Sequence, residues 1–213
     1  MTLTTGLLIA LIVPVFFALM SLRTGNFYYN ICMTGSCIVL LFAMPNPIVA
    51  LPVIVCFALS ILGDYFMGHH NNSNRYYIFG MCTFFLAHVA LVWYSYNKMD
   101  YAVWQLVLCG VLAIGYGIYL AMRIMPKVND HVIRVAIIAY ASISVIALTM
   151  GISLNVPMLQ RVLYALGVAS IVFSDTLICE SDFVGNQRPA RLIMPTYFLC
   201  HILITASLLV STM

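Results

Sequence analysis

Charged residues are scarce in this sequence. Of its 213 residues, nine are Lys or Arg and six are Asp or Glu, so charged side chains make up only 7%. A soluble globular domain normally carries about 25% charged residues, whereas 64% of this chain is hydrophobic. Because so little polar surface cannot cover a water-soluble body of this size, the composition predicts an integral membrane protein without a soluble domain. The net charge of +3 is too small to indicate a nucleic-acid partner.

The sequence also lacks the alternating pattern of membrane β-strands. In lipid, every backbone polar group must be satisfied within the protein, so only helix bundles and closed barrels can span the bilayer. The apolar runs here are about 20 residues long, which is the length of a transmembrane helix. We therefore expect an all-α integral membrane protein with eight transmembrane helices, at residues 3–22, 28–44, 47–68, 75–96, 101–122, 131–151, 159–180 and 189–209.

The seven cysteines form no recognisable motif. They lie singly within apolar runs, without a CxxC pair and without histidines at the spacing of a zinc site. Cysteine in such a context usually serves as a small apolar side chain that fills a helix interface. We therefore expect neither disulfides nor a bound metal, and no cofactor.

Basic residues are unevenly distributed among the expected loops. The loops that follow the odd-numbered helices, with their flanks, hold seven of the nine: Arg23, Arg75, Arg123, Lys127, Arg134, Arg188 and Arg191. The opposite side holds only Lys98 and Arg161. The positive-inside rule places the richer side in the cytoplasm. We thus expect a multi-pass protein of the cell (inner) membrane, with both termini outside the cytoplasm.

Two stretches of the chain resemble each other. The segment Thr83–His88 reads TFFLAH, and the segment Thr196–His201 reads TYFLCH. Asp64 and Asp175 likewise end two matching tripeptides, LGD and FSD, near the ends of the third and seventh helices, and they are 111 positions apart. The matched positions include the few polar residues of the apolar runs, which favours a repeat over chance.

An internal repeat predicts two halves, of about residues 1–98 and 99–213, within a single transmembrane domain of residues 1–213. Each half would contain four helices. Since four is even, both halves enter the membrane from the same side, and the repeats are parallel, related by an axis along the membrane normal.

Asp64 and Asp175 are the two residues that an apolar bundle has least reason to contain. An ionised Asp near the bilayer centre costs about 3 kcal/mol or more. Both are expected at a similar depth, close to the cytoplasmic ends of their helices. Two neighbouring carboxyls in a low dielectric cannot easily both ionise, which leaves an acid beside a carboxylate, the pair that acid-catalysed bond cleavage requires. The alternative is that each Asp separately joins helices by hydrogen bonds.

Other polar residues lie within reach of these acids. Ser60 precedes Asp64 by four positions and Tyr197 precedes His201 by four, so each shares a helix face with its neighbour and is able to orient it. His88 and His201 are expected deeper in the membrane, where a hydrogen bond between helices is as plausible as a functional role. Two Asp and two His also suit a divalent cation, but their different depths make this alternative weak.

Several of these residues belong to motifs that resemble the YhhN family of lysoplasmalogenases. The first motif comprises Ser60-Ile61-Leu62-Gly63-Asp64, Phe79-Gly80, Phe84 and His88, and the second comprises Leu166-Gly167, Phe173-Ser174-Asp175, Leu177 and Thr196-Tyr197. Tyr140 and Met150 also match the family's pattern, whereas His201 stands where the family usually has Gln.

The resemblance implies hydrolysis of the vinyl ether bond of lysoplasmalogens, which releases a fatty aldehyde and a glycerophospho-base. Asp64 and Asp175 would be the catalytic residues, with support from Ser174 and the polar residues named above. The partners would be a lysophospholipid substrate and bilayer lipid. Arg75 or Arg191 would pair with the substrate phosphate, as expected from their location in loops on the same side.

A small proton-coupled transporter of a lipid or small solute is the main alternative. Parallel repeats and intramembrane carboxylates fit such a carrier. Against it, the Asp pair is expected away from the membrane midplane, and Pro195 is the one candidate for a helix break. The absence of a GxSxG motif argues against a serine esterase.

Overall fold

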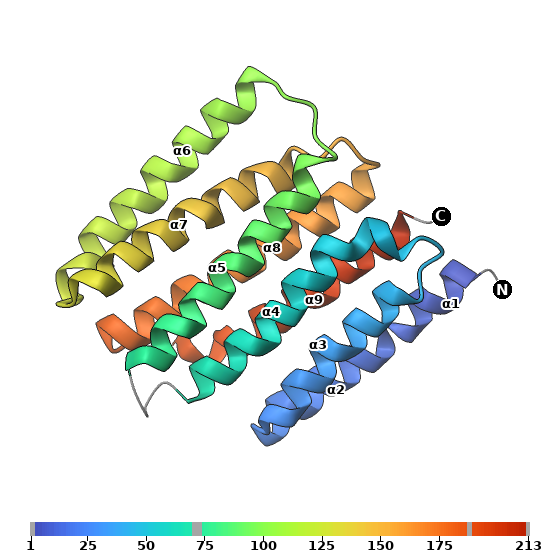
Figure 1. Cartoon of the computed structure of the whole chain (residues 1–213), viewed down its shortest axis with the longest axis horizontal. Helices are drawn as coiled ribbons and strands as arrows, with labels where there is room; N and C mark the ends of the chain where they lie inside the picture. The colour runs from blue at the N-terminus through green and yellow to red at the C-terminus, as the bar shows by residue number, and fades with distance from the viewer. Residues whose placement is uncertain (1–2, 70–73, 187–188, 212–213) are drawn as a thin grey trace.

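The computed structural model describes residues 3–69, 74–186 and 189–211, and these ranges are almost entirely helical (Figure 1). The α-helices are α1 (Leu3–Ala10), α2 (Ile12–Thr24), α3 (Phe27–Phe42), α4 (Leu51–Gly68), α5 (Asn74–Tyr96), α6 (Val103–Tyr119), α7 (His131–Ile152), α8 (Met158–Cys179) and α9 (Ile193–Val210). Short 3-10 turns, Pro47–Ala50 and Pro189–Leu192, precede α4 and α9.

Seven helical spans in the described ranges are long and apolar enough to cross a membrane, and the shorter apolar helix Phe27–Phe42 adds an eighth candidate. The protein is therefore an all-helical integral membrane protein, as the composition predicted. The expected helix boundaries agree with the observed ones to within a few residues.

The first predicted helix, 3–22, is divided in two. α1 ends at Ala10 and α2 begins at Ile12, although Thr5–Thr24 still forms one candidate span. Pro14 explains the break, because it has no N–H to donate to the carbonyl of Ala10, four residues before it.

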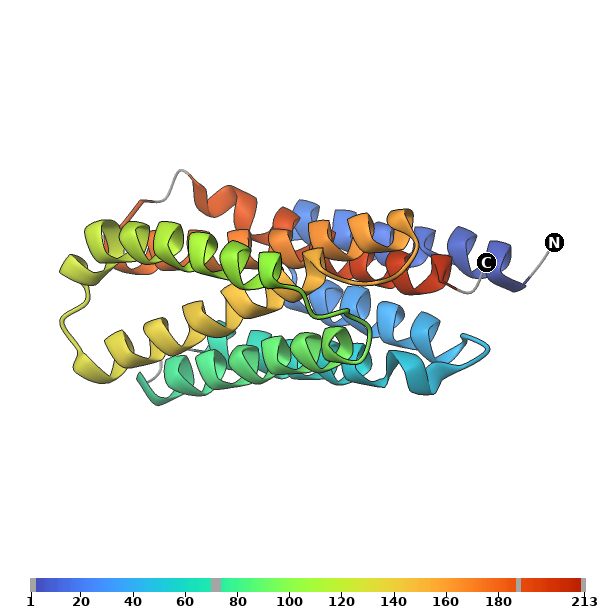
Figure 2. The same cartoon turned by 90° about the horizontal axis from the view of Figure 1, so that it is seen from above.

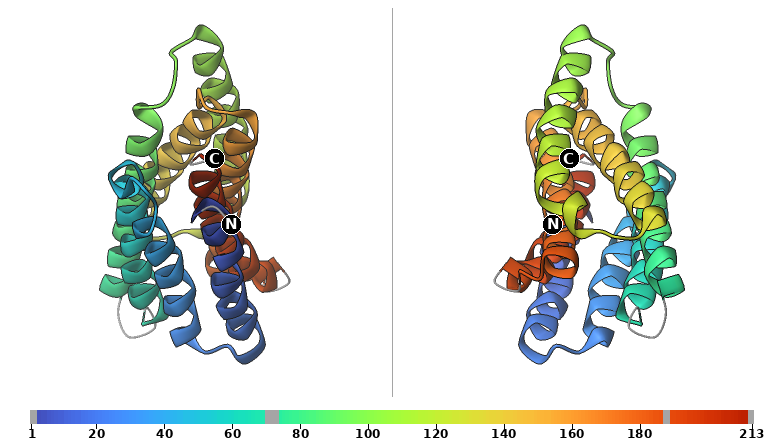
Figure 3. Two further views of the ribbon diagram at one scale, coloured as in Figure 1. Left: turned by 90° about the vertical axis from the view of Figure 1, so that its right-hand side faces the viewer. Right: turned by 90° about the vertical axis from the view of Figure 1, so that its left-hand side faces the viewer.

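The helices pack chiefly in sequential pairs. α4 packs along α5 and α8 along α9, while α5 also contacts α7 and α3 also contacts α9. Figures 2 and 3 show α3, α4 and α5 on one side of the bundle and α2, α8 and α9 on the other. α6 lies at one edge, against α7. The repeat of two four-helix halves stays a prediction.

Gly167 sets the distance between α8 and α9. A Cβ atom at this position would lie 2.6 Å from Cγ1 of Ile204 and 3.2 Å from the backbone oxygen of Cys200. Both neighbours belong to α9. The backbone of α9 cannot move away from an added side chain as easily as a flexible side chain can. Gly115 on α6 is different, because a Cβ there would meet nothing within 4 Å.

We therefore predict that Gly167→Val lowers the thermal stability of the detergent-solubilised protein, whereas Gly115→Val leaves it nearly unchanged. Overpacking of a close interface typically costs about 1–3 kcal/mol. The two variants introduce the same side chain into a helix, so helix propensity is matched. Equal melting temperatures for the two variants would show that the α8–α9 contact is not close.

The orientation in the membrane is a second prediction of this arrangement. α1 begins and α9 ends at the same end of the bundle (Figure 1). The basic residues counted above predict that this end is outside the cytoplasm; of them, Arg188 lies outside the described residues. A reporter that is active only in the cytoplasm should be active when inserted after Lys127 and inactive when fused to either terminus. The reverse pattern would overturn the orientation.

Candidate active site

Asp64 lies on α4, four residues before the helix ends at Gly68. The hydroxyl of Tyr197 on α9 donates a hydrogen bond of 2.9 Å to its Oδ2 atom. Gly63, the preceding residue, allows α5 to approach closely, since a Cβ there would lie 2.9 Å from the ring of Phe84. The carboxyl of Asp64 is thus held between α4 and α9, and it keeps partial exposure.

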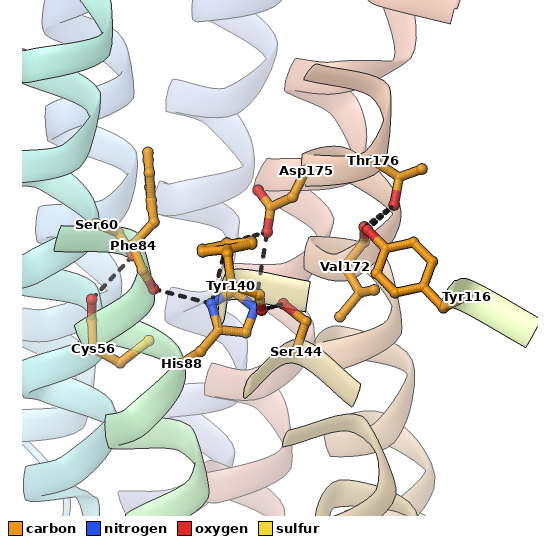
Figure 4. A network of polar contacts seen from close by, with 10 residues as sticks. All are labelled: Cys56, Ser60, Phe84, His88, Tyr116, Tyr140, Ser144, Val172, Asp175 and Thr176. Carbon is orange, nitrogen blue, oxygen red and sulfur yellow. Dashed lines mark hydrogen bonds and ion pairs between the residues drawn. The ribbon is translucent and has the colours of Figure 1, made fainter. Parts of the chain in front are cut away.

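Asp175 occupies the corresponding position on α8, four residues before the helix ends at Cys179. It is buried, and the hydroxyl of Tyr140 on α7 donates a hydrogen bond of 2.5 Å to its Oδ2 atom (Figure 4). Nε2 of His88 on α5 lies 3.8 Å from the same oxygen. The sequence motifs contained Tyr140, but its contact with Asp175 was not foreseen.

His88 and His201 each contact the backbone carbonyl four residues earlier through Nδ1, and Nδ1 of His88 also lies 3.2 Å from the hydroxyl of Tyr140. Nδ1 of His88 lies 3.0 Å from the carbonyl oxygen of Phe84, and Nδ1 of His201 lies 3.0 Å from that of Tyr197. Because a carbonyl can only accept, Nδ1 is the donor in each ring, and Nε2 of a neutral imidazole carries the lone pair. Neither Nε2 atom has a hydrogen-bond partner among the described residues.

Both imidazoles line one enclosed cavity of about 10 Å³, together with Ser60. A cavity of that size is close to the minimum for one water molecule. The two rings, from α5 and α9, therefore border the same small and mainly apolar cavity inside the bundle.

A second cavity, of about 40 Å³, is lined by Asp175 and Tyr140. Its remaining lining is mainly apolar and sulfur-containing: Met67, Tyr77, Met81, Phe84, Ile178 and Cys179. Phe84 borders both cavities.

The surroundings of the two carboxyls meet at two aromatic rings. Tyr197 donates its hydrogen bond to Asp64, Phe84 lines the cavity beside Asp175, and no direct hydrogen bond joins the two carboxyls within the described part of the chain. The rings of Phe84 on α5 and Tyr197 on α9 pack edge to face, with centroids 6.4 Å apart.

Two of the supporting residues have different partners from those expected. Ser60 does not bond to Asp64; its hydroxyl donates to the carbonyl of Cys56 at 3.0 Å, four residues earlier. Tyr197 does not orient His201 through its hydroxyl, which is directed to Asp64. A serine in a helix readily donates a hydrogen bond to the carbonyl of the preceding turn, and Ser60 forms this local bond instead of one to the carboxyl of Asp64.

The remaining candidates lie at the edges of the site. Ser174 is buried, and its hydroxyl donates to the carbonyl of Ile193 at 3.0 Å, which joins α8 to the start of α9. Arg75 and Arg191 are exposed near the starts of α5 and α9. In the described ranges, no three His, Cys, Asp or Glu side chains gather in a way suited to a metal ion.

The fold and the site define an integral membrane protein with two tyrosine-bonded carboxyls inside a helical bundle. The model of the YhhN family matches residues 28–208, and the chain belongs to that family. The match extends from α3 through most of α9 and so includes every candidate site residue. No curated protein and no solved structure is a match for the chain.

Proposed function

We propose that the protein is a hydrolase that cleaves the vinyl ether bond of lysoplasmalogens. Membership of the YhhN family is consistent with this activity. The observation that carries the proposal is the pair Asp64 and Asp175, each of which accepts a hydrogen bond from a tyrosine hydroxyl inside the helical bundle. Vinyl ether hydrolysis needs one acid to protonate carbon and one base to activate water, and two carboxyls supply both.

Asp175 is the better candidate for the general acid. It lines the small cavity with mainly apolar walls, which suits the apolar double bond that is to be protonated. Its proton passes to the β-carbon of the double bond, whose π electrons form the new C–H bond. The positive charge that results is shared by the α-carbon and the ether oxygen. The hydroxyl of Tyr140 stabilises the carboxylate that remains.

Asp64 then acts on water. The oxygen of a water molecule adds to the α-carbon, and one of its protons moves to Asp64, which gives a hemiacetal. The bond from this carbon to the glycerol oxygen breaks as that oxygen takes the proton from Asp64. The hemiacetal hydroxyl gives its proton to Asp175 and becomes the aldehyde carbonyl. Both carboxyls end in their starting states, so no further reactant is needed.

The depth of the site suits a lipid with one chain. Asp64 lies four residues, or about 6 Å of helix rise, before its span ends at Gly68, and Asp175 lies nine residues, or about 13 Å, before its span ends at Val184. A headgroup at the membrane surface would therefore leave the ether bond of the same molecule at the level of the carboxyls. The location of Arg75 and Arg191 near this surface made them the first candidates for contact with the phosphate.

We predict that Asp64→Asn and Asp175→Asn each reduce aldehyde release by at least 100-fold, since general acid–base catalysis typically contributes about 10²–10⁴-fold. Asn is nearly isosteric and still accepts the tyrosine hydrogen bond, so the variants should remain folded. Asp130→Asn is the matched control. Asp130 caps α7 through hydrogen bonds to the N–H groups of Val132 and Ile133, and Asn caps a helix equally well.

The double variant should lose little more activity than either single one, because each change disables the same reaction. His201→Gln should be mild, since Gln is the usual residue of the family there. If either Asn variant kept more than about a tenth of the activity, its carboxyl would be structural rather than catalytic. If the wild-type protein released no aldehyde but moved protons or lipid across vesicles, the transporter alternative would replace the hydrolase.

A further inference from the structure

Two π-helical turns lie against each other at the end of the bundle where α4 and α8 terminate. One is Leu120–Ile124, which continues α6, and the other is Glu180–Val184, which continues α8. π-helical turns are rare and are frequent at functional sites. Each of these turns carries one charged side chain directed to the other, Arg123 on the first and Glu180 on the second.

The carboxylate of Glu180 is only half satisfied. Its Oε1 atom accepts hydrogen bonds from the hydroxyl of Tyr119 at 2.7 Å and from Nε of Arg123 at 3.0 Å. Glu180 is only 7% exposed, and its Oε2 atom is buried without a hydrogen-bond partner in the described part of the chain. The side chain of Asn186 also contacts the carboxylate, but among the described residues no donor reaches Oε2 with the geometry of a hydrogen bond. A buried carboxylate oxygen without a donor is unfavourable, so Oε2 suits a cationic N–H donor from a ligand.

Arg123 presents the opposite charge to the surface. Its side chain is 53% exposed, and its ion pair with Glu180 uses Nε. Among the described residues the two terminal nitrogens have no partner, and a guanidinium binds phosphate through two parallel hydrogen bonds.

The pair is joined to the candidate active site by two tyrosines. The rings of Tyr116 and Tyr119 stack in parallel, with centroids 6.2 Å apart. The hydroxyl of Tyr116 lies 3.0 Å from that of Thr176, the residue after Asp175 (Figure 4). Glu180, the first residue of the π-helical turn after α8, lies five residues beyond Asp175, which corresponds to about 7 Å along the helix axis. In the substrate the ammonium group also lies beyond the phosphate, further from the ether oxygen than the glycerol backbone alone.

We propose that Arg123 and Glu180 bind the headgroup of the lysolipid substrate, with the phosphate on Arg123 and the primary ammonium group of ethanolamine on Oε2 of Glu180. In this arrangement the negative phosphate lies against the positive Arg123, and the positive ammonium group lies against the negative Glu180. Choline has no N–H to donate, so the site favours ethanolamine. This proposal rests on the proposed function, and it moves the phosphate contact from Arg75 or Arg191 to Arg123.

Kinetics with two headgroups test the assignment. Glu180→Gln keeps an acceptor for Tyr119 and Arg123 but loses the charge. It should raise KM about tenfold for the ethanolamine lysoplasmalogen and less than threefold for the choline one, with kcat unchanged. Arg123→Gln should raise KM for both substrates. Lys127→Gln is the control, because Lys127 is an exposed cation four residues from Arg123, and it should change neither.

A binding measurement separates this proposal from the proposed function. The probe is the saturated ether analogue of the ethanolamine lysolipid, which has no double bond to protonate. Its equilibrium dissociation constant should rise about tenfold with Glu180→Gln and with Arg123→Gln. This result would support the headgroup site even if the wild-type protein released no aldehyde from any lysoplasmalogen. Unchanged binding in both variants, or weakening confined to Arg75→Gln or Arg191→Gln, would overturn it.

Discussion

Inside a bilayer, a polar side chain finds its partner within the protein or remains unsatisfied, because lipid offers none. In this bundle that requirement is met by two tyrosine–carboxyl hydrogen bonds. Tyr197 and Asp64 join α9 to α4, and Tyr140 and Asp175 join α7 to α8. The same bonds that hold these helices together also hold the two acids in place. Fold and candidate site therefore depend on the same contacts, and isosteric substitutions are needed to separate their effects.

The two acids resemble each other in position but differ in their partners. The predicted repeat aligns Tyr197 with Phe84, which has no hydroxyl group to donate. Asp175 receives its hydrogen bond from Tyr140 instead, and it also lies 3.8 Å from Nε2 of His88. One carboxyl therefore has an imidazole beside it, whereas the hydrogen-bond partner of the other is Tyr197. This asymmetry suits a division of labour in which one carboxyl protonates carbon and the other activates water.

The sequence predicted the helices well, because apolar runs of membrane length are visible without any knowledge of packing. It also singled out Asp64 and Asp175, since ionisable residues are rare in such runs. It did not predict their tyrosine partners or the pairing of Arg123 with Glu180, which are 57 positions apart. Those contacts depend on how each helix is rotated about its axis and how it crosses its neighbours. The apolar pattern of a membrane helix contains little information about which of its sides is turned towards another helix. The break after Ala10 was missed although Pro14 gives a sufficient local cause.

The central claim is that an intramembrane carboxyl protonates a carbon atom of the substrate. Hydrolysis of a lysoplasmalogen by the purified protein in D₂O, with the aldehyde trapped by reduction and analysed by mass spectrometry, tests this claim directly. Protonation of the vinyl ether predicts one deuterium on the carbon next to the aldehyde carbon, beyond the exchange seen when authentic aldehyde is incubated alone. The saturated ether analogue should release nothing. Aldehyde without deuterium at that carbon, or cleavage of the saturated analogue, would contradict the account.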